Sequence, residues 1–368
     1  MKKILFLIQL PPPVHGVSQI NEQVFNSKIF DQDFQKSLVQ LKFSDNLKDL
    51  RKFNLKKVIR FCKVFFKLVY KILKDRPDFI YFSIMPVGPG FFRDIFFVFI
   101  TKLFRVKPIY HLDNRGISIR SRKKWKKRIY RWVFNNSIII HLSEGLLAME
   151  ILPLGLKNTQ FYVIPNGVKR IKSEIFNTKK DGFNILFISN LLEAKGVFIV
   201  LEAFSMLEKK HQNIYLEIAG DSFNEKIDDK IRDYILKNKL TDRINFHGGI
   251  YGKKKYQLYQ NADVFAFPSF FDQECFPLVI LEAMSFGLPV ITTYEGAIPE
   301  IIKNEKNGFL IKPKNAPELS EKLEMLYKNR KLLSKIGENN REIFWEKYSF
   351  EVFEKNLKRV FDSIIEGS

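Results

Sequence analysis

The sequence is poor in cysteine and has no long uninterrupted hydrophobic run. Its two cysteines, Cys62 and Cys275, stand far apart with no ligand-like spacing, so we expect a reducing compartment and neither a disulfide framework nor a zinc site. The apolar run at 95–104 is interrupted by Lys102 and is too short to span a bilayer. The stretch 1–13 superficially resembles a signal peptide, but its apolar part is short and ends in three prolines without a cleavage site. We therefore predict a first β-strand there.

Common phosphate-binding and metal-binding motifs are also missing. Neither GxGxxG nor GxxxxGK[ST] occurs, so the sequence supports neither dinucleotide nor triphosphate binding. No DxD motif stands in a suitable loop at the end of a strand. We expect no cofactor and no essential metal.

Apolar residues and positive charge are plentiful. The apolar fraction of 46% over 368 residues is enough for two folded domains, each with its own core. The net charge of +21 is unevenly distributed, because residues 1–170 carry 32 of the 61 Lys and Arg residues but only 11 of the 40 Asp and Glu residues. The remaining residues carry 29 of each kind. This asymmetry predicts an anionic surface or partner for the N-terminal half alone.

Short β-branched and aromatic runs alternate with longer helical patterns along the whole chain. This alternation predicts βα units, parallel sheets and an α/β fold with two sequential Rossmann-like domains. The lysine-rich stretch 168–182 looks like a linker between them, and 349–365 is predicted to be the last helix. The predicted strands lie at 3–10, 37–41, 79–84, 108–113, 137–143, 160–165, 183–189, 214–220, 244–249, 263–269, 289–293 and 308–311.

Ligands of open parallel sheets bind at the carboxyl ends of the strands, so the loops after the strands are the candidate sites. The loop after strand 263–269 leads into an apolar run that carries two glutamates, Glu274 and Glu282. A carboxylate beside a packed core costs several kcal/mol unless it is paired or hydrogen-bonded. This placement indicates a binding site. The alternative to a binding site is that Glu282 is an ordinary helix residue and that Glu274 is a charged residue of the loop.

The chemistry of that run fits a nucleotide-activated sugar. A helix is predicted to begin near Pro277, after Phe276, because proline is favoured in a first helical turn. The next amides, of Leu278 and Val279, suit a diphosphate. Glu282 shares their face of the helix and would reach an attached ribose, while Glu274 would lie beside the transferred sugar.

Three further loops carry candidate residues. Lys195 in "NLLEAKG" can counter the charge of a diphosphate leaving group, and Gly196 allows a tight turn. His111 in "YHLDNRG" could bond a sugar hydroxyl, although a lone histidine is more often structural. Gly16 in "PPPVHGVSQ" opens the first helix and leaves room for a ligand near the backbone.

Two basic segments account for much of the positive charge. Residues 51–74 form a helical stripe of lysine and arginine beside an apolar face, which we expect to pack on the sheet. Residues 120–132 interleave eight basic residues with tryptophan and tyrosine, a composition that suits the headgroup region of an anionic membrane. No nucleic-acid motif accompanies either segment, and we expect no nucleic-acid partner. The predicted acceptor or membrane residues are Arg120, Arg122, Lys123, Lys124, Trp125, Lys126 and Lys127.

The combined motifs resemble the retaining nucleotide-sugar glycosyltransferases of the GT-B fold, in the large group called family 4. The resemblance covers nearly the whole chain and rests on the glutamate pair within "PS…E.FPLV.LEAM..G.PVI", on "IPNGV" and on "GAIPEII". It implies an N-terminal acceptor-side domain at 1–167 that faces a donor domain at 168–349 across an interdomain cleft. It also implies that the last helix, at about 350–368, packs back on the first domain.

The resemblance also implies a role for each residue of this chain that matches a functional position of the family. Glu274 would hold the donor sugar, Glu282 the ribose, and Lys195 with the helix amides the diphosphate, while His111 would stand near the reaction centre and Gly16 in the acceptor-side loop. The family usually has a second diphosphate-binding arginine where this chain has Asn190.

The resemblance also implies a donor and a pathway. It implies a nucleotide-sugar donor, for which we favour a UDP-sugar because UDP is the commonest donor nucleotide of such enzymes, and a lipid-linked or polysaccharide acceptor in capsule, O-antigen or lipopolysaccharide assembly. The basic segments indicate that the protein is peripheral on the cytoplasmic face of the membrane. The alternatives are a noncatalytic partner that kept the fold and, less favoured by the glutamate spacing, a nucleotide-sugar epimerase.

Overall fold

The computed structural model describes residues 1–43, 55–169, 182–222 and 225–367. The predicted linker therefore lies almost entirely outside the described residues.

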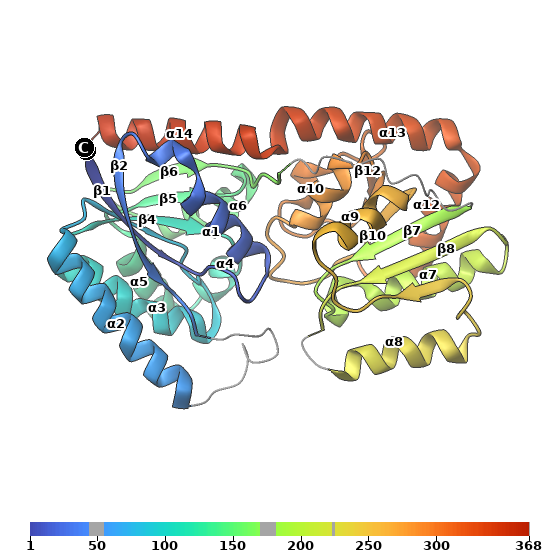
Figure 1. The fold of residues 1–368 in the computed structure, drawn as a ribbon, viewed down its shortest axis with the longest axis horizontal. Coiled ribbons are helices and arrows are strands. Elements are labelled where there is room, and N and C mark those ends of the chain that lie inside the picture. The colour runs from blue at the N-terminus through green and yellow to red at the C-terminus, as the bar shows by residue number, and fades with distance from the viewer. Residues whose placement is uncertain (44–54, 170–181, 223–224, 368) are drawn as a thin grey trace. The chain divides into compact units, whose positions relative to one another are not determined.

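The chain divides into two compact units, each built on its own parallel sheet (Figure 1). Unit 1 comprises Met1–Asn166 and Phe353–Ser368, and unit 2 comprises Gly167–Val352. A strand forms at each of the twelve predicted positions, six in each sheet. The predicted α/β class with two Rossmann-like domains is confirmed.

The sheet of unit 1 has the order β2-β1-β3-β4-β5-β6, with every neighbouring pair parallel. Its strands are β1 (Lys2–Ile8), β2 (Phe34–Gln40), β3 (Phe79–Phe82), β4 (Lys107–Leu112), β5 (Ile138–His141) and β6 (Gln160–Val163). Its helices are α1 (Gly16–Asn26), α2 (Leu55–Asp75), α3 (Gly88–Leu103), α4 (Ile117–Arg120), α5 (Lys124–Phe134), α6 (Glu144–Leu146) and most of α14 (Phe350–Glu366).

Helices cover both faces of this sheet, which is why its central strands are apolar on both sides. Because successive side chains of a strand alternate between faces, Leu5 and Leu7 pack in one core with residues of α2, α3 and α5. Phe6 points the other way, where it meets Phe30 at 5.5 Å, and Phe30 in turn meets Phe361 of α14 at 4.8 Å.

The sheet of unit 2 has the order β12-β11-β10-β7-β8-β9 and is also parallel. The chain builds β7, β8 and β9 in one direction and then returns to place β10, β11 and β12 on the other side of β7. The strands are β7 (Phe183–Ile188), β8 (Ile214–Ala219), β9 (Ile244–Phe246), β10 (Val264–Phe267), β11 (Val290–Thr292) and β12 (Gly308–Leu310). The helices are α7 (Val197–Glu208), α8 (Glu225–Lys237), α9 (Gly252–Asn261), α10 (Leu278–Ser285), α11 (Ile298–Ile301), α12 (Ala316–Lys328) and α13 (Arg330–Ile343).

This order creates a topological switch point between β7 and β10. In doubly wound sheets the ligand crevice lies outside the carboxyl ends of the two strands at the switch point. The loops that follow β7 and β10 therefore occupy the position where a ligand of unit 2 is expected.

Candidate functional site

The switch point of unit 2 brings Lys195 and Glu274 into contact. Lys195 ends a short 3-10 turn after β7, and Glu274 lies in the loop after β10. The Lys195 Nζ lies 2.6 Å from Glu274 Oε2, and the hydroxyl of Ser269 donates to the same oxygen at 2.9 Å. The side chain of Lys195 is 14% exposed and that of Glu274 is 7% exposed. Glu274 is thus buried and paired, as a buried carboxyl group must be to avoid a large desolvation cost.

Two glycines allow the loops around this pair to pack closely. Gly196 has φ +90°, and a Cβ there would lie 2.3 Å from the carbonyl oxygen of Pro268. Gly296 has φ +56°, and a Cβ there would lie 2.3 Å from the carbonyl oxygen of Glu274. Each position combines a left-handed backbone with a contact that excludes any side chain. The structure gives the predicted turn at Gly196 its physical reason, and Gly296 is a supporting residue that the sequence analysis missed.

The helix after this loop, α10, begins at Leu278 with Pro277 as its N-cap. Among the described residues no side chain caps the helix, so its first amides, including those of Leu278 and Val279, lack a capping acceptor there. Phe276 is buried ahead of the helix, where its ring lies 6.0 Å from that of Tyr348. Glu274 precedes this N-terminus by only a few residues in the chain, and Lys195 contacts Glu274 directly.

Glu282, in the second turn of α10, is held by two residues that the sequence analysis did not single out. Lys255 Nζ lies 2.7 Å from its Oε1, and the Tyr259 hydroxyl donates to its Oε2 at 2.9 Å. Both partners belong to α9, four residues apart on one face of that helix. Burial raises the pKa of Tyr259 well above its usual value, and the charge of Glu282 raises it further, so the hydroxyl stays a donor. The i, i+4 spacing was the one sequence signal for this pair, and it is common to many helices.

Asn190 stands two residues after the end of β7, in the loop that follows Ser189, and is partly buried. Its carbonyl oxygen accepts from the amide of Leu192 at 2.9 Å, within the loop that leads to Lys195.

The residues predicted in unit 1 lie apart from this arrangement in the sequence and have different surroundings. His111, in β4, is wholly buried, and its Nδ1 is hydrogen-bonded with the hydroxyl of Tyr81. Burial lowers the pKa of His111, while its Nε2 has no partner among the described residues. Gly16 is exposed and begins α1, whose N-cap is His15. In this conformation His111 presents no ring atom to solvent, and its expected role near the reaction centre stays a prediction.

The basic segment 120–132 forms the end of α4, a short turn and most of α5. Arg122, Lys123 and Lys124 are exposed, while Arg120, Lys126 and Lys127 are partly buried. Trp125 is 53% exposed. No acidic residue stands in the first turn of α5, and no side chain caps it. Because a helix N-terminus favours negative charge, this cationic turn is electrostatically costly unless an anion lies near it.

Within the described ranges, no helix combines the length and apolar character needed to cross a membrane. The same residues contain no group of three or more His, Cys, Asp and Glu side chains arranged to hold a metal ion.

The family comparison points to the same segment as the geometry. Residues 168–343 match the model of the family described as Glycosyl transferases group 1. This segment is a glycosyl transferases group 1 domain. It contains Lys195, Lys255, Glu274 and Glu282, the four charged residues of the arrangement in unit 2.

Curated relatives are similar over different shares of their length. An uncharacterized glycosyltransferase of Methanocaldococcus jannaschii, MJ1607, is 30% identical over 182 residues, which are 50% of this chain and 45% of that protein. The capsular polysaccharide biosynthesis glycosyltransferase CapM of Staphylococcus aureus is 26% identical over 281 residues, which are 71% of this chain and 72% of CapM. The chain thus spans about half the length of the first relative and most of the second.

A solved structure is similar over the whole chain. The crystal structure of Anabaena Alr3699/HepE in complex with UDP and glucose superposes with a TM-score of 0.75 at 19% identity, covering 99% of this chain and 100% of that one. The chain has the GT-B fold.

Proposed function

We propose that the chain is a retaining glycosyltransferase of the family 4 type that transfers a sugar from a nucleotide-diphospho-sugar, with a UDP-sugar favoured. The observation that carries the proposal is the buried Lys195–Glu274 pair at the switch point of unit 2, next to the uncapped N-terminus of α10. The UDP bound in Alr3699/HepE, a protein of the same fold, supports the choice of nucleotide.

The groups of unit 2 have the chemistry that donor binding needs. Amides at the start of α10 and the ammonium of Lys195 can stabilise the negative charge that develops on a leaving diphosphate. Glu274 can accept hydrogen bonds from the hydroxyls of the donor sugar, and Glu282 from those of the ribose. Ser269, Lys255 and Tyr259 keep the two carboxylates in place before the donor arrives.

In the mechanism we propose, the acceptor attacks the anomeric carbon on the face that the diphosphate leaves. The departing phosphate takes the proton of the attacking hydroxyl, so no protein base is required. No step needs a metal ion, since Lys195 and the helix amides supply the positive charge.

We further propose that the acceptor is lipid-linked or a growing polysaccharide, in the assembly of a cell-surface glycan such as capsule, O-antigen or lipopolysaccharide. The similarity to CapM, a capsular polysaccharide biosynthesis enzyme by name, supports this pathway. The basic segments of unit 1 would hold the protein at the cytoplasmic face of an anionic membrane, where such an acceptor is embedded.

The test is donor turnover by the purified full-length protein across UDP-, GDP-, ADP- and TDP-sugars, with and without membrane extract and a chelator. We expect release of one nucleotide, stimulated by extract and unchanged by the chelator, and a product with the donor's anomeric configuration. Glu274→Gln should lower kcat/KM about 100-fold or more, because it removes a charged group from the site. Glu217→Gln, an equally buried carboxylate of β8 that pairs with His247, is the matched control and should retain turnover.

A noncatalytic partner is the competing function, and Asn190 is the residue that favours it. In that case a nucleotide sugar binds in equilibrium dialysis, but no acceptor preparation gives turnover. If no nucleotide sugar binds, or if Glu217→Gln and Glu274→Gln reduce binding equally, the donor site assigned to unit 2 is wrong.

A further inference from the structure

Helix α3 of unit 1 turns a continuous stripe of large apolar side chains toward solvent. Its members follow one face of the helix at intervals of four, three and four residues. They are Phe92 (51% exposed), Phe96 (55%), Phe99 (53%) and Leu103 (61%). Single exposed apolar residues are ordinary, whereas a row of three phenylalanines and a leucine on one helix marks an interaction surface.

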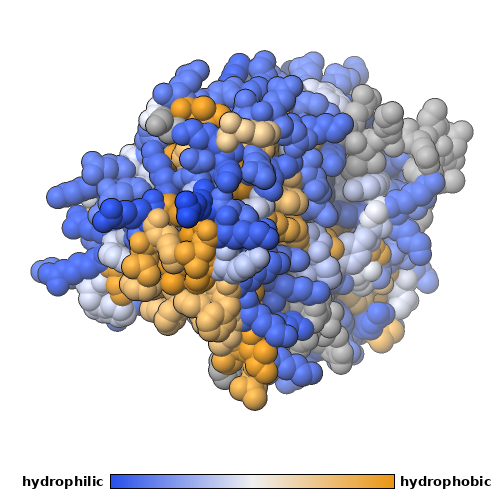
Figure 2. All heavy atoms as spheres, turned by 60° about the vertical axis from the view of Figure 1, so that its left-hand side comes forward, coloured by the Kyte–Doolittle hydropathy of each residue, from blue (hydrophilic) through white to orange (hydrophobic). Residues whose placement is uncertain are grey.

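The stripe is flanked by α2 on one side and α5 on the other. Phe61 of α2 lies 5.7 Å from Phe96, and Tyr130 of α5 stacks on Phe91 at 4.6 Å. The outward face of α2 is also apolar. The exposed large apolar residues of α2 are Leu55, Val58, Ile59, Phe66, Tyr70 and Leu73. Figure 2, with unit 1 turned toward the viewer, shows an apolar patch bordered by hydrophilic side chains.

This result extends what the sequence predicts for α2. The expected packing of its apolar face is present, because Val64, Leu68 and Ile72 are buried against the core. The helix has further apolar residues on the opposite face, where the sheet does not cover them.

Positive charge lies on both sides of the patch. The exposed basic residues of α2 are Lys56, Lys63, Lys67 and Lys74, and those before and within α5 are Arg122, Lys123, Lys124 and Arg128. An apolar patch between two cationic borders is complementary to an anionic bilayer. The lipid phosphates would contact the cations, while the apolar side chains of the patch would enter the acyl layer. A second copy of the chain is a poorer fit, because it would bring two surfaces of the same charge together.

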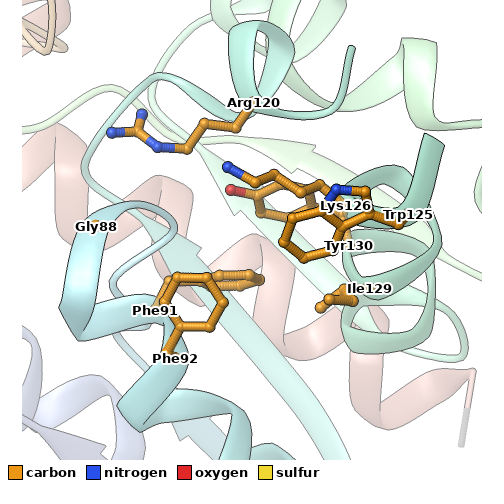
Figure 3. Close-up of a pocket in the computed structure, with 8 residues that line it drawn as sticks. All are labelled: Gly88, Phe91, Phe92, Arg120, Trp125, Lys126, Ile129 and Tyr130. Atoms are coloured by element: carbon orange, nitrogen blue, oxygen red, sulfur yellow. The ribbon is translucent and has the colours of Figure 1, made fainter. Parts of the chain in front are cut away.

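A pocket opens at the α5 side of the stripe (Figure 3). Its empty volume of about 360 Å³ includes space that is open to solvent, so the pocket is a shallow surface hollow. Two of the residues that line it, Arg120 and Lys126, are cationic, and none of those described is acidic. Figure 3 shows the charged ends of Arg120 and Lys126 on one side of the pocket and the rings of Phe91 and Phe92 on the other.

Both cations are available to a ligand. Arg120 makes one long hydrogen bond, 3.4 Å to the carbonyl oxygen of Gly116, and Lys126 lies 5.3 Å from the ring of Trp125. Neither has a carboxylate partner among the described residues. The nearby carboxylate of Glu150 accepts instead from the amides of Gly116 and Ser118.

We propose that the stripe of α3 inserts into an anionic bilayer and that the pocket beside it binds the phosphate of a lipid through Arg120 and Lys126. This inference rests on the membrane attachment proposed above and specifies the element that inserts and the group that is bound. Arginine and lysine are suited to phosphate oxygens, and Trp125 would lie at the headgroup level of the bilayer, where tryptophan is enriched.

Sedimentation of the full-length protein with vesicles tests the stripe. We expect binding to phosphatidylcholine vesicles that contain phosphatidylglycerol, and we expect a large part of it to persist at high salt, since insertion of apolar groups is not screened. Phe96→Ser/Phe99→Ser should weaken binding at least about tenfold, while the control Leu236→Ser/Met325→Ser, at exposed sites of α8 and α12, should leave it within about twofold.

A matched pair of variants tests the pocket. Arg120→Gln/Lys126→Gln and Arg122→Gln/Lys124→Gln remove the same charge from the same segment, but only the first pair lines the pocket. We expect the first pair to bind the anionic vesicles about tenfold more weakly than the second.

These experiments distinguish membrane attachment itself from the specific roles of the stripe and the pocket. If the unaltered protein binds no vesicle, the membrane attachment itself fails, whatever its donor turnover. If it binds, but both charge pairs weaken binding equally, or high salt abolishes it, attachment is a diffuse surface charge effect and the inserted stripe and pocket are wrong. A change of oligomeric state in Phe96→Ser/Phe99→Ser without loss of vesicle binding would instead assign the stripe to a protein interface.

Discussion

Each carboxylate of the arrangement in unit 2 is held by one lysine and one hydroxyl. Glu274 has Lys195 and Ser269, and Glu282 has Lys255 and Tyr259. The two lysines balance the two negative charges, and each hydroxyl occupies a further acceptor site. This pairing explains how a largely apolar segment carries two buried carboxylates, since the desolvation cost of each is offset locally.

The position of Lys195 depends on the residue that follows it. Gly196→Ala would require a left-handed alanine whose Cβ overlaps the carbonyl oxygen of Pro268. We expect it to cost about 2–4 kcal/mol of unfolding free energy, from the backbone penalty and the overlap together, and to move Lys195 away from Glu274. Urea denaturation measures the first effect and nucleotide-sugar affinity the second.

Gly248→Ala is the control for this substitution. Gly248 also has a left-handed backbone, at φ +65°, but a Cβ there would meet nothing within 4 Å. Its cost should therefore be limited to about 1–2 kcal/mol, and donor affinity should not change. Equal losses of stability and affinity in both variants would contradict the role given to the close contact with Pro268.

At the scale of elements, the strands were predictable and the surroundings of some of their side chains were not. All twelve strands were predicted, because a strand that is buried on both faces consists of a short run of apolar residues, and such a run is a strong local signal. The glutamate pair was predictable because charge is unusual in such a run. The fate of His111 was not, since burial depends on helices distant in sequence, and Tyr81 and the neighbouring strands enclose its ring.

The outward stripe of α3 was missed for a related reason. Phenylalanine occurs on both sides of this helix, with Phe91 and Phe97 buried and Phe92, Phe96 and Phe99 exposed. A helix that is apolar all round normally reads as fully buried, and the sequence does not say which face the sheet leaves uncovered. The lysine partner of Glu282 lies on a separate helix, so only the tertiary structure pairs them.

Buried histidine in β5 makes unit 1 sensitive to acid. Burial lowers the pKa of His141 to about 3, with a further contribution from His111, whereas the unfolded chain binds the proton near pH 6.5. Stability is therefore complete above pH 6.5 and is lost as the pH falls toward 3, because only the unfolded state takes up the proton in that window. Between pH 6.5 and 5 this amounts to about 2 kcal/mol for the one group.

Urea unfolding at pH 7 and pH 5, followed by tryptophan fluorescence, measures this dependence. His141→Gln cannot titrate, so its stability should fall by about 2 kcal/mol less than that of the unaltered protein over the same interval. The same pH dependence in both proteins would show that His141 is not the group responsible.

At the scale of the whole molecule, unit 1 is completed by the last residues of the chain. Its segments Met1–Asn166 and Phe353–Ser368 are separated by all of unit 2. Phe361 of α14 packs 4.8 Å from Phe30 and 5.6 Å from Phe34, and Ser27 donates to Glu354 at 2.6 Å. Contacts at such sequence separation form late, so the core of unit 1 should reach its full stability only after α14 has docked.

This dependence predicts that a single substitution near the C-terminus destabilises the N-terminal half. Phe361 is 2% exposed, and Phe361→Ala should cost about 3–5 kcal/mol by leaving a cavity against Phe30 and Phe34. Phe350→Ala lies in the same helix at a partly exposed position, where the ring contacts Lys169, and should cost only about 1 kcal/mol. Hydrogen exchange locates the effect: Phe361→Ala should accelerate exchange in β1 and β2 while β7 and β10 keep their protection. Faster exchange in β7 and β10 instead would place α14 in the stability of unit 2 and would overturn the assignment of the chain's last helix to unit 1.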